Sequence, residues 1–344
     1  MSILSDRAVI IRGPSMSTYK VFTPVRWASN RHLQTLLPVI LNKRGSVVYD
    51  RQELILPDGD FVDLDWLNKP DSKTIKPVLL IFHGLEGSSQ SHYTRTLMQK
   101  AKQLNWHAVV MNFRSCSGRE NIRPQLYHSG ETADALFFIN WVKQNFPLAS
   151  LFAVGYSLGG NMLLKLAGEE GSKLALDALV SVSAPVKLDE STRYMVKGLS
   201  RFYQLYLLKQ LKNKFLQKNR QHDYKLLIGL DKSDIIKCKD IREFDNLFTA
   251  RIHGFKDAAD YYEKSSAYQY INKIKKPCLI LHANDDPIAP SSILPDNSSL
   301  PAPVQLEITT DGGHVGFLAG SITRPDYWLA DRILAYFLQY PVND

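Results

Sequence analysis

The chain has 344 residues, of which 44% are hydrophobic and 22% are charged, and this composition is typical of a soluble globular protein. Its three cysteines, Cys116, Cys238 and Cys278, are odd in number and lack ligand spacing, which argues against a disulfide framework and against a zinc site. Residues 1–11 are interrupted by charge and form neither a signal peptide nor a membrane span, so we expect a cytoplasmic protein.

Strand and helix patterns alternate along most of the chain. Residues 46–56 and 61–67 predict two strands joined by a hairpin turn, and helices are predicted over 93–104, 131–145, 161–167 and 327–338. Runs of buried-strand type lie at 77–82, 107–112, 151–154, 178–183, 277–282 and 304–309. Strands that alternate with helices indicate βαβ units, so the sequence predicts an α/β fold with a mostly parallel eight-stranded sheet flanked by helices.

One interval interrupts this alternation. Residues 185–275 contain several helical stretches and no strong strand, which predicts a helical cap inserted into a single domain, 1–344. The core is then expected over about 46–184 and 276–344, with 1–45 as an N-terminal extension packed on it. We expect the cap to cover the C-terminal edge of the sheet, because ligands of open α/β sheets bind at that edge.

Basic residues are concentrated in this cap. The formal net charge is +8, and residues 187–225 alone contain ten basic and three acidic residues. Apolar residues at helical spacing in the same segment predict an amphipathic basic helix; they are Leu199, Tyr203, Leu207, Leu211 and Phe215. A solvated helix face, or peripheral contact with an anionic membrane surface or an acidic substrate, would explain the charge. Nucleic acid is not expected as a partner, since no recognition motif accompanies the charge.

The most informative motif spans residues 155–159, Gly-Tyr-Ser-Leu-Gly. A buried strand precedes it and a helical pattern follows it, which is the context of the nucleophile elbow, where a serine stands on a tight strand-to-helix turn. Glycines on either side allow the strand and the helix to pass closely. Ser157 is therefore the candidate nucleophile.

A serine nucleophile requires a histidine base and a carboxylate that orients it, in the chain order serine, acid, histidine. Asp286 follows the strand at 277–282, and His314 follows the last strand on a glycine-rich loop. We favour Asp286 over its neighbour Asp285 as the acid because it directly precedes Pro287. Asp189 and Glu190 are also candidates for the acid, and His282 is interpreted as a packed strand residue.

The elbow also predicts an oxyanion hole. One backbone N–H comes from the residue after the nucleophile, Leu158, and the other from the loop after the strand at 77–82, where Leu85 is the natural donor. His83 in this loop is interpreted as organising it. The loop lacks the lysine of a phosphate-binding P-loop, and no cofactor or metal is expected.

Further motifs lie at 29–35, 56–66, 83–88, 112–118, 127–132, 253–255 and 261–262. With the elbow, they make the chain resemble, over almost its whole length, the YheT-like branch of the α/β-hydrolase superfamily. The resemblance implies a serine hydrolase that uses Ser157, Asp286 and His314 as its triad and acts on carboxylic esters, often with short or medium acyl chains. Small-molecule or lipid esters are thus the expected partners, and no oligomeric state is implied.

Two residues of this chain differ from those usual in the relatives, and the roles of several other residues stay predictions. Ser115 replaces a usual glycine and Arg31 a frequent proline, which bears on loop shape. We interpret Arg114 and Glu131 as an internal ion pair. An acyl pocket is expected in the cap, lined by Met195, Leu199, Phe202, Tyr203 and Tyr206. Acyl transfer to an alcohol, or a non-enzymatic binding protein on a hydrolase scaffold, would be the rival functions.

Overall fold

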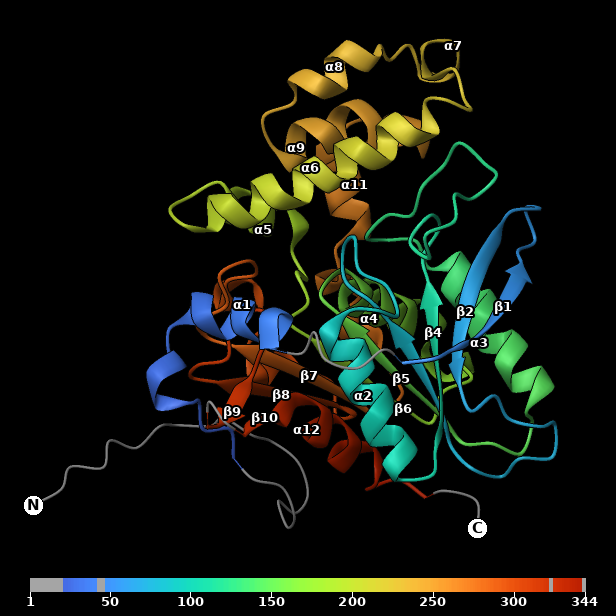
Figure 1. The fold of residues 1–344 in the computed structure, drawn as a ribbon, viewed down its shortest axis with the longest axis vertical. Helices are drawn as coiled ribbons and strands as arrows, with labels where there is room; N and C mark the ends of the chain where they lie inside the picture. Colours follow the sequence, from blue (N-terminus) through green and yellow to red (C-terminus); the bar gives the residue numbers. More distant parts are fainter. Residues whose placement is uncertain (1–20, 42–46, 322–323, 342–344) are drawn as a thin grey trace, which may run out of the picture.

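The computed structural model describes residues 21–41, 47–321 and 324–341. Its centre is an eight-stranded sheet in the order β1-β2-β4-β3-β5-β6-β7-β8 (Figure 1). The strands from β4 to β8 are parallel, whereas β1 and β2 run antiparallel to their neighbours. The predicted fold class is therefore confirmed. The bounds are β1 Asp50–Ile55, β2 Phe61–Leu67, β3 Val78–Phe82, β4 His107–Asn112, β5 Leu151–Tyr156, β6 Ala178–Val182, β7 Cys278–Ala283 and β8 Val304–Thr309.

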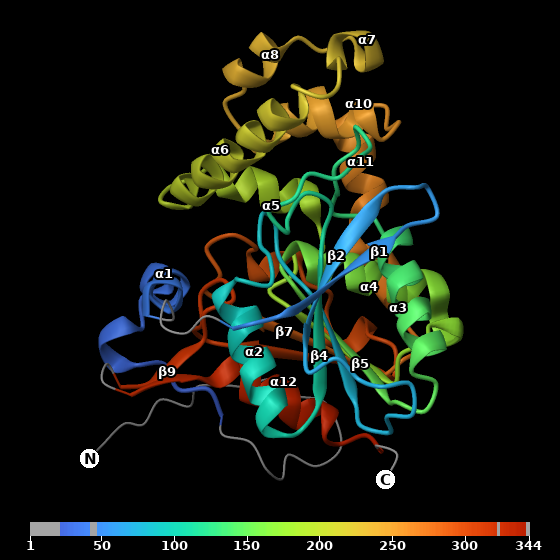
Figure 2. The ribbon, with the colours of Figure 1, turned by 45° about the vertical axis from the view of Figure 1, so that its right-hand side comes forward.

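Helices cover both faces of the sheet, which is why its central strands are apolar along their whole length. On one face lie α2 (His92–Gln103) and α12 (Trp328–Phe337), and on the other lie α3 (Ala133–Asn145) and α4 (Leu158–Glu170), as Figures 1 and 2 show. Each pair of helices closes a separate apolar core with its face of the sheet. The predicted helix at 161–167 is longer than expected, because α4 begins directly after Ser157.

The segment between β6 and β7 contains helices and no strand, and it lies above the C-terminal edge of the sheet (Figure 1). It has its own apolar core, which includes Phe215, Tyr224 and Phe248. We propose the role of a cap for this segment, as the sequence suggests. Its helices are α5 Leu188–Met195, α6 Ser200–Lys218, α7 Tyr224–Ile228, α8 Lys232–Lys237, α9 Ile241–Phe244, a π-helical turn Asp245–Thr249, α10 Ala250–Ile252, α11 Ala258–Ser265 and a 3-10 helix Ala267–Lys273.

Two lysines of α6 correct the interpretation of this helix as a solvated basic face. Lys214 and Lys218 are buried against the core domain. Lys214 Nζ lies 2.9 Å from Glu86 Oε1 and 3.0 Å from Cys116 Sγ, and Lys218 Nζ donates to the Asn121 carbonyl at 2.6 Å. Helical periodicity marks the charged positions of a helix but does not show which of them meets another part of the chain. The C-terminal half of α6 thus anchors the cap to the core.

The N-terminal extension is described from residue 21 onward, so the expectations for residues 1–20 and 42–46 lie outside the described residues. Helix α1 (Arg31–Leu41) packs beside a small hairpin formed by β9 (Leu318–Gly320) and β10 (Pro325–Tyr327), which the sequence patterns do not predict. Within the described ranges, every helix is too short or too polar to cross a lipid bilayer.

Candidate active site

Ser157 stands at the junction of β5 and α4 in a strained backbone conformation, with φ 50° and ψ −115°. The flanking glycines are required by space. A Cβ on Gly155 would lie 2.3 Å from the Gly159 carbonyl oxygen, and a Cβ on Gly159 would lie 2.5 Å from the His83 carbonyl oxygen. A positive φ at a non-glycine residue persists only where its surroundings impose it, and the structure therefore has the geometry of the predicted elbow.

His314 and Asp286 complete a continuous hydrogen-bonded chain with this serine. The Ser157 hydroxyl lies 2.9 Å from His314 Nε2, and His314 Nδ1 lies 2.9 Å from Asp286 Oδ2. Asp286 is 1% exposed and His314 is 7% exposed. Because a carboxylate can only accept, Nδ1 carries the proton and Nε2 is free to accept from the serine. The structure thus brings together the three side chains that the sequence proposed.

The neighbouring carboxylates have different tasks. Asp286 Oδ1 accepts the amides of Ile288 at 2.8 Å and Ala289 at 2.9 Å, which fixes the carboxylate toward His314. Asp285 instead accepts the Gly313 amide at 2.9 Å and supports the histidine loop. Burial raises the pKa of Asp285 to about 6. The geometry therefore favours Asp286 over Asp285 as the orienting acid.

Asp189 and Glu190, which the sequence also allows as the acid, are engaged within the cap. Asp189 forms ion pairs with Arg193 and Arg242, and Glu190 pairs with Lys187. None of these contacts includes His314.

His282 has a supporting role, as the sequence suggests. It is fully buried in β7, and its Nε2 donates to the Ala289 carbonyl at 2.8 Å. Because Ala289 also donates its amide to Asp286, this packed histidine helps to fix the acid loop.

Helix α1 holds the histidine loop in place, a role that the sequence does not reveal. The Thr35 hydroxyl accepts the His314 amide at 2.9 Å. The fully buried Gln34 accepts the Leu318 amide at 2.7 Å and donates to the Leu318 carbonyl at 3.1 Å. A Cβ on Gly316 would lie 1.9 Å from the Gln34 carbonyl oxygen. The glycines of the loop at 312–316 are the one sequence signal that another segment approaches closely.

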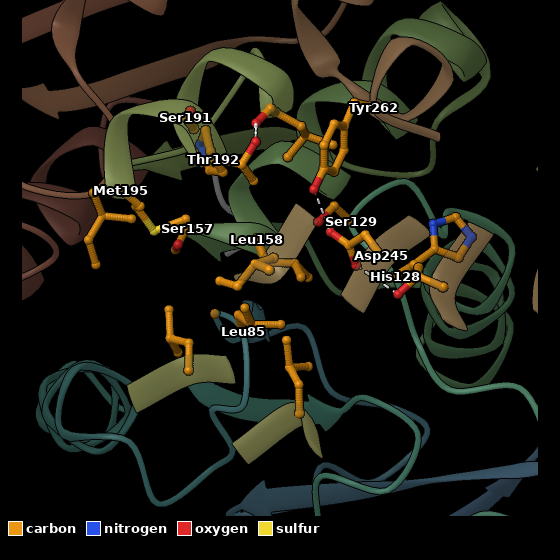
Figure 3. Close-up of a pocket in the computed structure, with 18 of the residues that line it drawn as sticks. Leu85, His128, Ser129, Ser157, Leu158, Ser191, Thr192, Met195, Asp245 and Tyr262 are labelled. Atoms are coloured by element: carbon orange, nitrogen blue, oxygen red, sulfur yellow. Dashed lines mark hydrogen bonds between the residues drawn. The ribbon is translucent and has the colours of Figure 1, made fainter. Parts of the chain in front are cut away.

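The two amides predicted for the oxyanion hole are free to donate. Within the described residues, neither the Leu85 amide nor the Leu158 amide has a hydrogen-bond acceptor. The loop that carries Leu85 lies against the nucleophile, since a Cβ on Gly84 would be 3.2 Å from the Ser157 Cβ. Leu85 and Leu158 also face each other across the cavity in Figure 3. This arrangement is compatible with an oxyanion between the two amides.

Two side chains fix the shape of this loop. His83 Nε2 accepts the Phe113 amide at 3.1 Å, so the proton is on Nδ1, which donates to the Gly84 carbonyl at 2.7 Å. Burial lowers the pKa of His83 to about 3, and the ring stays neutral. Glu86, which has a φ of 55°, is held by Lys214 of the cap and by the Tyr127 hydroxyl, which donates at 2.8 Å. The cap and the loop are thereby linked.

An inner cavity of about 200 Å³ lies between Ser157 and the cap (Figure 3). Apolar side chains line much of it: Leu85, Leu158, Met195, Leu207, Leu211 and Ile241. Its far wall is polar, because the Asp245 carboxylate accepts from the Tyr262 hydroxyl at 2.7 Å and from the Thr249 hydroxyl at 2.7 Å. Burial raises the pKa of Asp245 to about 6.

A wider outer groove of about 820 Å³ reaches His314 from the side of α1. Its lining includes His314 and Leu85, which also line the inner cavity. Of the five residues expected to form an acyl pocket, Met195 lines the inner cavity, whereas Leu199, Phe202, Tyr203 and Tyr206 line the outer groove. The five residues are therefore divided between two hollows that share Leu85, Leu207 and His314, and their role in holding an acyl chain stays a prediction.

Among the described residues, His128, Glu131 and His253 place metal-ligand atoms within 4.8 Å of one another. However, His128 Nδ1 accepts the Gly130 amide at 3.1 Å, so the proton is on Nε2, which lies 3.5 Å from Glu131 Oε2. Although burial raises the pKa of Glu131, the contact with His128 lowers it to about 2. A protonated Nε2 has no lone pair for a metal, and we interpret the group as a neutral histidine that directs its N–H toward the Glu131 carboxylate.

This pair also corrects the partner expected for Arg114. The guanidinium lies 2.7 Å from Asp134 and bonds to Asp58 at 2.8 Å and Asp60 at 3.2 Å. Asp134 lies in the first turn of α3 and is buried, whereas Glu131 precedes the helix and faces His128. Arg114 therefore ties α3 to the turn after β1.

Known proteins resemble this chain in sequence and in fold. The family described as "alpha/beta hydrolase fold" matches residues 77–321. YheT of Escherichia coli (strain K12), named as a candidate esterase, is 46% identical over 319 residues, which cover 93% of each chain. Phospholipase ABHD3 of Mus musculus is 28% identical and covers 99% of this chain and 86% of its own. The solved Pyrococcus furiosus esterase Pf2001 shares the fold, with a TM-score of 0.54 at 16% identity over 85% of this chain and 90% of that one.

The chain therefore belongs to the α/β-hydrolase family. Within that family it is YheT-like, as the motifs of its sequence indicate.

Proposed function

We propose that the chain hydrolyses carboxylic esters through a Ser157–His314–Asp286 triad and an acyl-enzyme intermediate. The observation that carries this proposal is the hydrogen-bonded chain from Asp286 Oδ2 through His314 to the Ser157 hydroxyl, at 2.9 Å for each step. Family membership and relatives named as an esterase and a phospholipase support ester hydrolysis as the reaction class.

The first step is acylation. His314 Nε2 takes the hydroxyl proton as Ser157 Oγ attacks the ester carbonyl, and the oxyanion accepts hydrogen bonds from the amides of Leu85 and Leu158. Asp286 keeps Nδ1 protonated and stabilises the imidazolium that forms. The imidazolium then gives its proton to the departing alcohol. In the second step the same base activates water, which releases the acid and restores the serine.

The two hollows have different chemistry, and this supports different roles. The inner cavity is mostly apolar, and its volume of about 200 Å³ is below the usual range of ligand pockets, so it suits a short or medium acyl chain. The outer groove is larger and reaches Leu85 and His314, so it suits the alcohol portion, including that of a lipid ester. The basic cap adds attraction to anionic surfaces.

Replacement of the nucleophile tests this function. The Ser157→Ala protein should lose hydrolysis of p-nitrophenyl butyrate, with kcat lower by about 10⁶-fold, and should lose labelling by a fluorophosphonate probe. Ser172→Ala, at an exposed serine far from the site, is the matched control and should retain both. A panel of esters of increasing acyl length, run beside these variants, measures the capacity of the inner cavity.

The same measurements distinguish hydrolysis from its two rival functions. Retained hydrolysis in Ser157→Ala would contradict the triad. A wild-type protein that no serine-directed probe labels would indicate a binding protein on a hydrolase scaffold. If added alcohol yields mainly a new ester and little free acid, the protein is an acyltransferase with the same triad.

A further inference from the structure

Large apolar side chains are exposed on two neighbouring helices. On α1 they are Leu33, Leu36, Val39 and Ile40, and at the start of α6 they are Leu199, Phe202, Leu205 and Tyr206. We call these eight residues the apolar rim. Phe202 is 68% exposed and Ile40 is 56% exposed, values unusual for clustered large apolar groups on a soluble domain. Such a cluster indicates a surface that contacts something other than water.

The apolar rim surrounds the entrance to the proposed site. Five of its members also line the outer groove: Leu36, Val39, Leu199, Phe202 and Tyr206. The groove reaches His314, so its mouth and the reacting groups are continuous. The two helices are joined across it, because His32 Nδ1 lies 3.0 Å from the Tyr203 hydroxyl. Figures 1 and 2 both place α1 below the end of the cap where α5 meets α6.

The charge beside the apolar rim has a single sign. Residues 191–222 contain eight basic residues and no acidic residue. Lys214 and Lys218 are used inside the protein, but Lys197, Arg201 and Lys209 are exposed close to the rim residues of α6. This arrangement suits an anionic phospholipid surface, because the apolar side chains can insert between the acyl chains while the basic side chains contact the lipid head groups.

We propose that the apolar rim docks on an anionic phospholipid surface, so that a lipid ester passes from the bilayer into the outer groove without crossing water. This inference rests on the proposed function for the use of the groove. A second copy of the chain is a poorer occupant. A twofold contact would set the same basic residues against each other, whereas anionic lipid neutralises them.

The test is sedimentation of the full chain with vesicles. Phosphatidylcholine vesicles with and without phosphatidylglycerol are compared, and binding to the anionic vesicles is expected. Ile40→Glu with Leu205→Glu changes two apolar rim residues that do not line the groove. Transfer of one large apolar side chain into lipid favours binding by about tenfold or more, so the double variant should bind roughly a hundredfold more weakly. Leu226→Glu, at an 84% exposed leucine on α7, is the matched control and should bind like the wild type.

Two further measurements distinguish a loss of vesicle binding from misfolding and from a failure of the proposed chemistry. The double variant should retain hydrolysis of p-nitrophenyl butyrate in solution, which shows that it is folded. The Ser157→Ala protein should bind vesicles normally, because docking does not require the nucleophile, so failure of the proposed chemistry would leave the vesicle result unchanged. The proposal is overturned if wild type ignores both kinds of vesicle, if Leu226→Glu loses as much binding as the double variant, or if the wild type is a dimer in solution that the double variant dissociates.

Discussion

Replacement of Asp286 by asparagine reverses one hydrogen bond of the proposed triad while it preserves shape. The amides of Ile288 and Ala289 both donate to Oδ1, so the asparagine must place its carbonyl oxygen there. Its NH₂ group then occupies the Oδ2 position, which at 2.9 Å is nearer to His314 Nδ1 than Oδ1 is at 3.1 Å, and Oδ1 already accepts both amides. Because that group can only donate, Nδ1 becomes an acceptor and the proton moves to Nε2, which can no longer accept from Ser157.

The size of the effect follows from this tautomer. The equivalent change in a serine protease triad leaves the geometry intact and lowers kcat by about 10⁴-fold, or about 5.5 kcal/mol in transition-state stabilisation. We expect a similar loss in Asp286→Asn, measured as kcat for p-nitrophenyl butyrate. The thermal unfolding midpoint should change little, because both amide hydrogen bonds remain.

Asp285→Asn is the matched control. Its oxygen can still accept the Gly313 amide, so its kcat should stay within about tenfold of the wild type. The reasoning is refuted if Asp286→Asn keeps activity within about tenfold of the wild type, or if Asp285→Asn loses as much activity as Asp286→Asn.

Two further predictions concern buried charge near the site. Lys214→Met leaves the buried Glu86 carboxylate without its cation, so it should lower the free energy of unfolding by about 3–5 kcal/mol and should also lower kcat/KM. Lys209→Met, on the exposed side of α6, is the control and should change the free energy of unfolding by less than about 0.5 kcal/mol. Equal effects of the two variants in urea denaturation would contradict the anchoring role of Lys214. Burial raises the pKa of Asp245 from 3.8 to about 6, so the native state binds more protons than the unfolded state between these values and stability falls as pH rises through them. Asp245→Asn should therefore stabilise the protein more above about pH 6 than below about pH 4, and a pH-independent difference in urea denaturation would count against this.

The fold could be predicted from the sequence because its strands are continuous apolar runs and its helices are periodic. The small hairpin of β9 and β10 was missed, since each strand has three residues and no alternation to detect. The sequence also placed Arg114 with Glu131. The helix begins only at Ala133, so Glu131 lies outside it, whereas Asp134 lies in its first turn and binds Arg114.

The candidate site was predictable where residues follow strand ends, as Ser157, Asp286 and His314 do. The position before Pro287 favoured Asp286 over Asp285, whereas the amides of the acid loop that fix its carboxylate are seen only in the structure. The support from Thr35 comes from 279 residues away along the chain, so only the folded structure reveals it.

The anchoring of α6 has a mechanical consequence. Lys214 fixes the helix near its C-terminal end, while Phe202, at the groove, lies twelve residues earlier, about 18 Å along the axis. Leu211, at the inner cavity, lies only about 4.5 Å from the same point. A tilt of the helix about Lys214 would thus move Phe202 about four times as far as Leu211. If the two hollows have the proposed roles, such a tilt would change the width of the entrance for the alcohol group more than the part of the acyl space beside Leu211.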